Sequence, residues 1–367
     1  MNQQNRLGRL KERLSNMGIE GALVTSPLNV YYFTGFYCDP MERFLALWVD
    51  IKKDADILFV PGLDAEAARA SSGVSGIVPV GDTEDPYEVL ASRTGRSIKT
   101  LGIEKKHISQ HAYERIAAAL APDTVSEIED AIMSFRFRKT EEELDRVRKA
   151  VRVAEQAMEL GVKLIKPGMA ELELVAEIEY QIRVLGGERP AFATSVLGGA
   201  RSANPHGKPA VYRFQPNDYI LIDMGVYLQG YCSDITRTFL LGEGTKQQHD
   251  IYETVLEANR RAIEAVKPGE PFSRVDIAAR SHIESRGYGP YFNHRVGHGF
   301  GIEIHEPPSV HGQADSLMAP GALFTIEPGI YVPQTGGVRI EDDVCIHEDG
   351  RVEVLTRYPK ELIRLPV

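Results

Sequence analysis

The sequence predicts an α+β protein with two domains, an α/β domain over residues 1–130 and a larger α+β domain over residues 131–367. Two observations favour this division. The chain has 367 residues, whereas a single domain typically has about 100–200. Helical and strand patterns alternate along the first domain, whereas the second contains a segment that repeats.

The first domain begins with a helical pattern and continues with short strands. Apolar residues first recur at helical spacing, at Leu7, Leu10, Leu14 and Met17. Strands are expected at residues 21–25, 44–49, 56–60 and 76–80, and helices near residues 64–70, 87–93 and 111–120. This alternation predicts a mixed sheet flanked by helices.

The second domain is expected to open on a long helix. Thr140-Glu-Glu-Glu143 has the form of a capping box, in which the hydroxyl and the carboxylate each satisfy a free amide at the helix start. The apolar face continues through Leu144, Val147, Val151, Ala154 and Met158. Pro167 and Gly168 are expected to end the helix.

An internal repeat follows this helix. Lys166-Pro-Gly168 recurs as Lys267-Pro-Gly269, with helical patterns around both copies. The register continues in two further pairs, Ile182 with Ile283 and Gly186 with Gly287. The repeat predicts two related half-domains about a pseudo-twofold axis. The alternative is that Lys-Pro-Gly is only a common way to end a helix.

Composition excludes several classes of partner. The chain has 42 Lys+Arg against 52 Asp+Glu, a formal net charge of −10, and no basic block that could follow a phosphate backbone, so nucleic acid and anionic membranes are not expected. Residues 1–10 lack the apolar core of a signal peptide, and no stretch approaches the ~20 apolar residues of a membrane span, so we expect a cytoplasmic protein. The three widely separated cysteines are expected to be reduced, buried thiols: Cys38, Cys232 and Cys345.

The strongest indication of function begins with two aspartates in a predicted hairpin. Residues 219–228 and 231–241 read as strands joined by a turn, which places Asp223 and Asp234 on one face as direct or diagonal neighbours. Two carboxylates within an apolar strand pair repel each other unless they share a proton or a cation. We interpret the pair as metal ligands, the alternative being ordinary strand-end or surface residues.

Three further motifs each supply one side chain that can bind metal. His298 lies among glycines in residues 297–301, and Glu327 and Glu341 each end an apolar, strand-like run. Each motif is weak alone, but the five side chains together form an oxygen-rich set that suits paired Mn²⁺, Co²⁺ or Zn²⁺ ions. Two ions roughly 3.5–4 Å apart can activate a water and polarise a carbonyl, which predicts a hydrolase.

In this order, the motifs resemble those of the "pita-bread" metallopeptidases. The shared features are the aspartate hairpin, Gly-His-Gly-x-Gly-x-x-x-His-Glu-x-Pro from Gly297, Glu327-Pro-Gly and Arg339-x-Glu341. The resemblance covers essentially the whole chain. It implies a catalytic domain of two half-domains over residues 131–367 after a creatinase-type N-terminal domain over residues 1–130. It also implies a homodimer, with the first domain serving dimer contact and substrate access.

The resemblance implies two divalent ions per subunit, Mn²⁺ first, with Co²⁺ or Zn²⁺ as alternatives. Their ligands would be Asp223, Asp234, His298, Glu327 and Glu341. Asp223 would bind one ion through both oxygens, and Asp234 and Glu341 would bridge the ions. His298 and Glu327 would complete the other site, and Glu327 would also move protons.

Further residues follow from the same resemblance. His206 and His305 would bind the scissile carbonyl and stabilise its oxyanion, and Arg339 would orient the ligating carboxylates. The remaining histidines match no ligand position and are expected to be surface residues or local hydrogen-bond partners: His107, His111, His249, His282, His294, His311 and His347.

Within this family, an Xaa-Pro dipeptidase (prolidase) is favoured, because residues 291–298 and 305–309 resemble those of dipeptidases from Gram-positive bacteria. Some prolidases bind the substrate carboxylate with an arginine where this chain has Ser309, and Arg295 is expected to substitute for it. One alternative is aminopeptidase P, which acts on longer peptides. The non-enzyme alternative is an inactive homologue that binds peptides or proteins.

Overall fold

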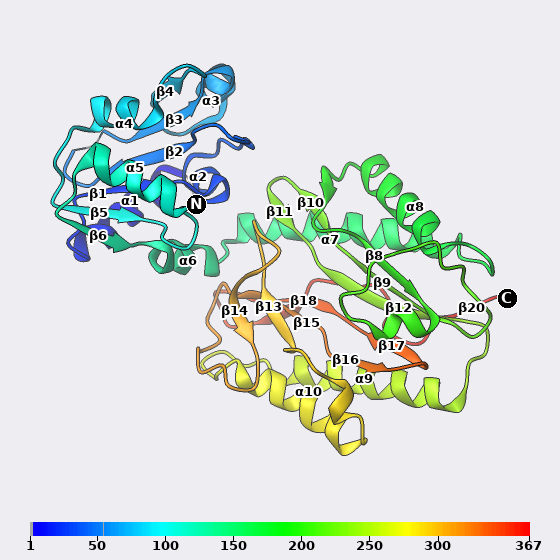
Figure 1. The fold of residues 1–367 in the computed structure, drawn as a ribbon. Coiled ribbons are helices and arrows are strands. Elements are labelled where there is room, and N and C mark those ends of the chain that lie inside the picture. The colour runs from blue at the N-terminus through cyan, green and yellow to red at the C-terminus, as the bar shows by residue number, and fades with distance from the viewer. Residues whose placement is uncertain (1–2, 54) are drawn as a thin grey trace. The chain divides into compact units, whose positions relative to one another are not determined.

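The computed structural model describes residues 3–53 and 55–367, which form two compact units, Met1–Phe135 and Arg136–Val367 (Figure 1). The division falls a few residues beyond the boundary expected from the sequence. Among the described residues, no helix is both long enough and apolar enough to cross a membrane.

The first unit is a six-stranded sheet with helices packed against it. Its strands lie in the order β4-β3-β2-β1-β5-β6. Their bounds are β1 Gly21–Val24, β2 Ala46–Asp50, β3 Ile57–Pro61, β4 Gly76–Val80, β5 Thr100–Ile103 and β6 Thr124–Glu127. The helices are α1 Gln3–Asn16, α2 Pro27–Thr34, α3 Ala65–Ser71, α4 Pro86–Thr94 and α5 Gln110–Leu120, and α6 Glu129–Phe137 leads into the second unit. Parallel and antiparallel pairs are both present, so the expected mixed sheet is confirmed.

The sequence patterns missed α2, β5, β6 and α6. Helix α2 illustrates why, because a residue far along the chain organises its start. The buried carboxylate of Glu104, just beyond β5, accepts hydrogen bonds from the backbone amides of Thr25 and Ser26. It thereby satisfies free amides at the start of α2, a contact that no local periodicity reveals.

The second unit contains two pairs of long helices and two main sheets. The helices are α7 Glu141–Val162, α8 Glu171–Val184, α9 Lys246–Glu264 and α10 Ser273–Ser285. One sheet has the order β20-β12-β9-β8 and the other β14-β13-β15-β18-β19. Bounds in the first are β8 Ser195–Gly198, β9 Tyr219–Met224, β12 Ile235–Leu241 and β20 Arg364–Leu365. Bounds in the second are β13 Gly297–Gly299, β14 Glu306–Val310, β15 Leu323–Ile326, β18 Asp342–Ile346 and β19 Val352–Val354.

Smaller sheets complete this unit. One joins β7 Arg189–Pro190, β10 Val226–Leu228 and β11 Tyr231–Cys232, and another pairs β16 Gly329–Val332 with β17 Gly336–Arg339. One apolar core lies between α7, α8 and the sheet that contains β9 and β12. A second lies between α9, α10 and the sheet that contains β15 and β18.

The two half-domains correspond closely, which confirms the pseudo-symmetric fold. Gly168 and Gly269 have φ of 83° and 84° and lie in the loop after the first helix of each copy. Gly186 and Gly287 have φ of 90° and 83° and lie just beyond the end of the second helix, so both copies use left-handed glycines at the same two places. The matched residues Ile182 and Ile283 are both fully buried.

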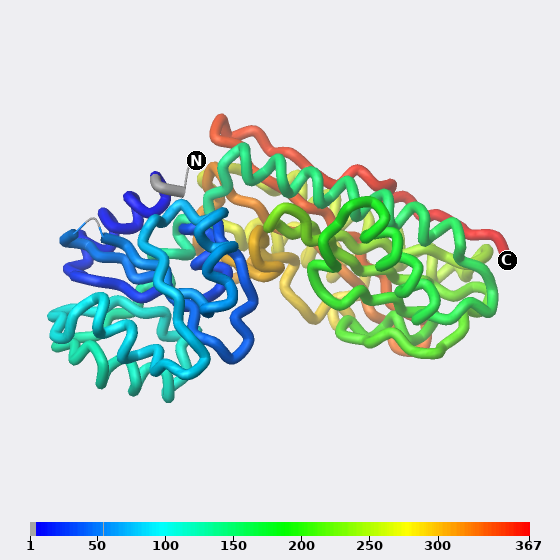
Figure 2. Tube along the Cα trace, turned by 90° about the horizontal axis from the view of Figure 1, so that it is seen from above, coloured from blue at the N-terminus to red at the C-terminus, as the bar shows by residue number. Residues whose placement is uncertain are grey.

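Helix α7 begins as expected and ends early. The complete capping box is present, with Thr140 accepting from the backbone amide of Glu143 and the Glu143 carboxylate accepting from that of Thr140. The helix stops at Val162, before Pro167 and Gly168. The C-terminal segment runs alongside α7 (Figure 2), where Arg148 pairs with Glu353.

Candidate metal centre

The aspartate pair lies on the hairpin formed by β9, β10, β11 and β12. The register pairs Asp223 with Thr236, so Asp234, two residues before Thr236, is the diagonal neighbour of Asp223. The strands are interrupted at Gly225, where a Cβ atom would lie 2.2 Å from the carbonyl oxygen of Ser233. The interruption leaves the register unchanged, because Tyr227 still pairs with Cys232 beyond it. Both carboxylates therefore face the same side.

The other three side chains come from the second main sheet. His298 lies on β13, Glu327 directly follows β15 and Glu341 directly precedes β18. The glycines beside His298 allow β13 to lie close to its neighbours: a Cβ on Gly297 would be 2.0 Å from the Thr325 carbonyl oxygen. A Cβ on Gly299 would be 2.2 Å from the Pro307 carbonyl oxygen. The Gly-His-Gly sequence thus serves strand packing as well as presenting the imidazole.

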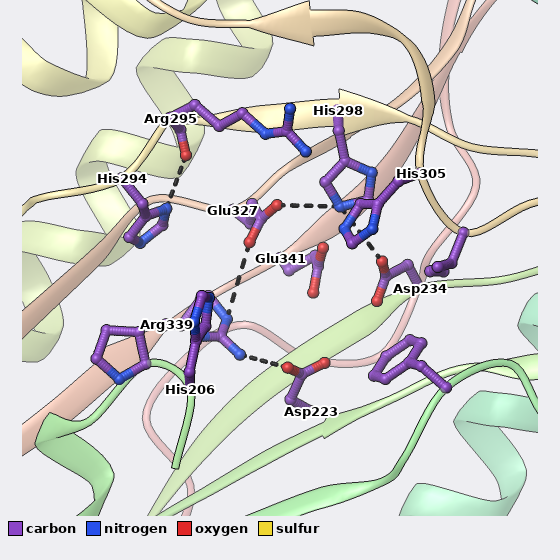
Figure 3. A pocket seen from close by; sticks show the side chains of 13 residues that line it. His206, Asp223, Asp234, His294, Arg295, His298, His305, Glu327, Arg339 and Glu341 are labelled. Carbon is purple, nitrogen blue, oxygen red and sulfur yellow. Dashed lines mark hydrogen bonds and ion pairs between the residues drawn. The ribbon is translucent and has the colours of Figure 1, made fainter. Parts of the chain in front are cut away.

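The five predicted ligands converge on one cavity of about 290 Å³ (Figure 3). His298 Nε2 lies 3.3 Å from Glu327 Oε1 and 3.7 Å from Asp234 Oδ2. Ligand atoms of Asp234, His298 and Glu341 all lie within 4.8 Å of one another. These are separations that one ion could span. Asp223 joins from the facing strand and lines the same cavity.

The electrostatics of this group favour bound cations. Burial and neighbouring carboxylates raise the pKa values of Asp234 and Glu341 well above their ordinary values. Burial also raises the pKa of Glu327, to about 7, although Arg339 opposes the rise. Burial and His305 lower the pKa of His298 to about 3, which leaves a neutral imidazole with a lone pair for a metal. This donor set fits a pair of divalent ions, because their charge removes the repulsion between the carboxylates.

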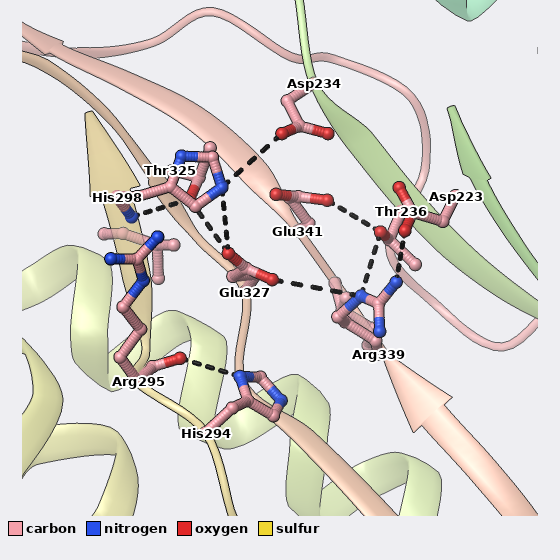
Figure 4. Close-up of polar contacts among 12 residues, drawn as sticks. Asp223, Asp234, Thr236, His294, Arg295, His298, Thr325, Glu327, Arg339 and Glu341 are labelled. Atoms are coloured by element: carbon pink, nitrogen blue, oxygen red, sulfur yellow. Dashed lines mark hydrogen bonds and ion pairs between the residues drawn. The ribbon is translucent and has the colours of Figure 1, made fainter. Parts of the chain in front are cut away.

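A hydrogen-bond network of residues that are not proposed ligands orients two of the proposed ligands (Figure 4). Thr236 donates its hydroxyl to Glu341 Oε2 at 2.6 Å and accepts from Arg339 Nε at 3.1 Å. The other end of the Arg339 guanidinium donates to Asp223 Oδ2. Arg339 is buried, as is Thr236, so the two side chains hold Asp223 and Glu341 in fixed orientations.

Three predicted substrate residues line the same cavity. His206 and His305 are exposed, and the His305 ring centroid lies 4.3 Å from that of His298. Arg295 is also exposed, and its Nη1 donates to the hydroxyl of Ser309 at 3.0 Å. The guanidinium therefore reaches the position at which some prolidases are expected to place an arginine.

One histidine that matches no ligand position also lies at the cavity, and it is a local hydrogen-bond partner, one of the two roles expected for it. His294 lines the cavity, and burial, together with Arg339, lowers its pKa to about 4. Its Nδ1 lies 2.7 Å from the carbonyl oxygen of Arg295 and its Nε2 3.1 Å from the Tyr331 hydroxyl, which accepts from Arg339. No ligand motif contains His294, so the sequence alone did not place it in the cavity. His294 lies four residues before His298, in the loop that enters β13, and this closeness to a proposed ligand was the available signal.

The cysteines differ from expectation in one respect. All three are free thiols, and Cys232 and Cys345 are buried. Cys38 is only partly buried, because it lies in the irregular segment between α2 and β2, where no regular element covers both sides.

Known proteins resemble this chain in both of its units. Residues 145–348 match the model of metallopeptidase family M24, and residues 6–138 match the creatinase/prolidase N-terminal domain. The chain is 40% identical to the Bacillus subtilis protein named "Putative dipeptidase YkvY", covering 98% of this chain and 100% of that protein.

Two solved structures have the same fold. The Xaa-Pro dipeptidase from Bacillus anthracis is 32% identical with a TM-score of 0.91, covering 99% of this chain and 100% of that one. The X-Pro aminopeptidase from Thermotoga maritima is 32% identical with a TM-score of 0.87, covering 97% of this chain and 99% of that one. These two proteins cleave substrates of different length according to their names, so overall similarity does not choose between the two activities.

Proposed function

The chain belongs to metallopeptidase family M24, and we propose that within this family it is an Xaa-Pro dipeptidase that hydrolyses the peptide bond preceding proline. One observation carries the proposal: five oxygen and nitrogen ligands, two exposed histidines and an exposed arginine line a single cavity. The oxygen-rich donor set favours Mn²⁺ as the working ion.

The bound ions would supply Lewis-acid polarisation of the scissile carbonyl and an activated water. The side chains of the chain would do the rest. His206 and His305 would donate hydrogen bonds to the carbonyl oxygen as negative charge develops on it. Glu327, whose pKa is raised to about 7, would carry a proton from the attacking water to the leaving nitrogen of proline.

The preference for dipeptides rests on Arg295. An enzyme limited to Xaa-Pro must sense the free carboxylate that immediately follows proline, and a guanidinium can grip a carboxylate with two charge-assisted hydrogen bonds. Arg295 is exposed and its partner in the cavity is the neutral hydroxyl of Ser309. A neutral partner leaves the positive charge available for a substrate.

A hydrolysis panel tests this proposal. The wild-type enzyme should cleave Xaa-Pro dipeptides and leave Xaa-Pro-Yaa tripeptides nearly intact. Arg295→Ala should raise KM for the dipeptides strongly and barely affect residual cleavage of Xaa-Pro-amide, which lacks the carboxylate. Ser309→Ala is the matched control, because it removes the neighbour of Arg295 and keeps the charge.

Two results would contradict the proposal in different ways. A wild-type preference for tripeptides would assign the chain to the aminopeptidase P activity. Equal damage to the dipeptide and the amide in Arg295→Ala would limit Arg295 to a structural role.

A further inference from the structure

A second group of metal-binding side chains lies outside the catalytic cavity, on the hairpin of β18 and β19. Cys345 and Glu353 are paired directly across the two strands. His347 follows Cys345 by two residues, so its side chain leaves the chain on the same face. A direct cross-strand pair and an alternate residue on one strand are the closest neighbours that a hairpin offers. The register of this hairpin therefore places a thiol, an imidazole and a carboxylate together.

The distances bear this out. His347 Nε2 lies 3.7 Å from Cys345 Sγ and 2.7 Å from Glu353 Oε2. The ligand atoms of all three residues lie within 4.8 Å of one another. Tetrahedral zinc, with bonds of about 2.3 Å to sulfur and 2.0 Å to nitrogen, holds sulfur and nitrogen roughly 3.5 Å apart. The Cys345–His347 separation already has this value within a few tenths of an ångström. The His347–Glu353 separation of 2.7 Å is that of a hydrogen bond and has to lengthen to roughly 3.3 Å when the ion binds.

The other ring nitrogen of His347 is also occupied in the way that metal sites require. His347 Nδ1 lies 2.6 Å from Glu141 Oε1, in the first turn of α7. Histidines that bind metal usually donate their second ring nitrogen to a carboxylate, which fixes the tautomer and the ring orientation. His347 and Cys345 are buried, which limits competition from water.

We propose that Cys345, His347 and Glu353 form a third metal site that binds a thiophilic divalent ion, Zn²⁺ first, with Glu141 orienting His347. The site is separate from the catalytic pair, and its ligand set differs from it by containing a thiol. A water molecule would complete four-fold coordination. The site would tie the β18–β19 hairpin, which directly follows Glu341, to the start of α7.

The charges balance when the ion is bound. Arg148 lies 2.9 Å from Glu353, 3.4 Å from Glu141 and 2.6 Å from Asp145, and Arg351 lies 3.9 Å from Glu353. The two arginines and the two charges of the ion together offset the three carboxylates and a Cys345 thiolate. Burial raises the pKa of Cys345 to about 12, so the thiol is protonated before binding. Formation of the sulfur–metal bond therefore releases one proton from Cys345 to solvent.

The competing interpretation is an ion-pair clasp without metal. Both ring nitrogens of His347 face carboxylate oxygens, and a doubly protonated ring could donate to Glu141 and Glu353 at once. Cys345 decides between the two interpretations, because the clasp needs no sulfur and the metal site does.

Cobalt spectroscopy of the full-length enzyme separates the two. A thiolate bound to Co²⁺ gives an intense near-ultraviolet charge-transfer band. The residues that line the catalytic cavity, within the described parts of the chain, include no cysteine, so ions bound there give no such band. We expect wild-type enzyme titrated with Co²⁺ to develop the band as a third equivalent binds, and excess Zn²⁺ to remove it.

Variants locate the site. Cys345→Ser should abolish the band and the third equivalent, whereas the control Cys232→Ser, which changes the other buried cysteine, should retain both. Glu141→Gln should retain the band and weaken binding by roughly 10–100-fold, as expected for a residue behind a ligand.

Two outcomes would overturn the proposal. One is wild-type enzyme that binds Co²⁺ at the catalytic pair alone, without a thiolate band; the ion-pair clasp would then stand. The other is a band that persists in Cys345→Ser. Because the readout is spectroscopic, neither result depends on whether the enzyme is an Xaa-Pro dipeptidase.

Discussion

Two groups of buried carboxylates in the second unit have pKa values shifted in opposite directions, because their charged neighbours differ. Glu306 is buried beside Lys139 and Arg136, whose side chains contact its two oxygens, and it accepts from the backbone amides of Ile302 and Glu303. Burial alone would raise the pKa of Glu306, but Lys139 and Arg136 lower it to about 2. This carboxylate is fully ionised and neutralised by the protein itself.

The candidate metal centre has the reverse arrangement. Asp234 and Glu341 are equally buried, yet their largest electrostatic neighbours are other carboxylates, so their pKa values are raised rather than lowered. The chain can supply buried cations, as it does at Glu306. The comparison supports the proposal that cations from outside the chain neutralise the carboxylates of the candidate metal centre.

The largest effect should come from removing the ions. Treatment with a chelator should abolish peptide hydrolysis, because the clustered carboxylates then have neither an ion to share nor a polarised carbonyl to act on. Re-addition of Mn²⁺ should restore the activity, which is measured as release of proline. Full activity in protein shown by elemental analysis to be metal-free would break the comparison.

The next effect concerns single ligands. Glu341→Gln and Asp234→Asn should each abolish turnover and lower the metal content, because each proposed bridge serves both ions. In metal-free protein the same changes should raise the free energy of unfolding, by on the order of 1 kcal/mol, since each removes one of several like charges. Glu348→Gln, at an exposed position, is the control. Normal metal content in either variant would remove that residue from the bridging role.

The five side chains proposed as metal ligands could be identified from the sequence, and they line one cavity, because their signals are local. The two aspartates are joined by a tight hairpin, and the register that pairs Asp223 with Thr236 follows from the strand pattern and the turn. The glycines around His298 signal close strand packing in the same way. Most strands and helices of the first unit could be located within a few residues for the same reason.

The features that were missed depend on contacts between distant parts of the chain. Glu104 satisfies the start of α2 from 78 residues away, and Arg136 reaches Glu306 across 170 residues. His294 enters the cavity through a loop that has no periodicity of its own. Such contacts are fixed by how sheets and helices pack, and a pattern with a period of two or 3.6 residues does not encode them.

The third prediction concerns the carboxylate of Glu306, which Arg136 and Lys139 neutralise. Glu306→Gln should lower the free energy of unfolding by roughly 3–5 kcal/mol, because it removes the buried carboxylate that pairs with both Arg136 and Lys139. Glu303→Gln is the matched control: Glu303 also contacts Arg136, at 2.7 Å, but its side chain is 38% exposed. The control should lose less than about 1 kcal/mol. Equal losses measured by denaturant unfolding would mean that burial of the pair is not what matters.

The last and smallest effect is the pH dependence of that difference. The pKa of Glu306 is about 2 in the folded protein, below the value of about 4.3 expected for an unfolded chain. The unfolded state therefore takes up a proton first as the pH falls. The stabilisation from this carboxylate is fully present above about pH 4.3 and is lost progressively as the pH falls towards about 2, by roughly 3 kcal/mol in total.

The Glu306→Gln variant has no titrating group at this position. Comparison of the wild-type protein with this variant therefore isolates the contribution of Glu306 from those of all other carboxylates. Urea unfolding at successive pH values should show the wild-type advantage constant above about pH 5 and shrinking steadily below about pH 4. An advantage that stays constant throughout the acid range would show that Lys139 and Arg136 do not hold the Glu306 carboxylate ionised. The comparison would then lose its first half, the claim that Lys139 and Arg136 neutralise Glu306, and only the argument about the candidate metal centre would remain.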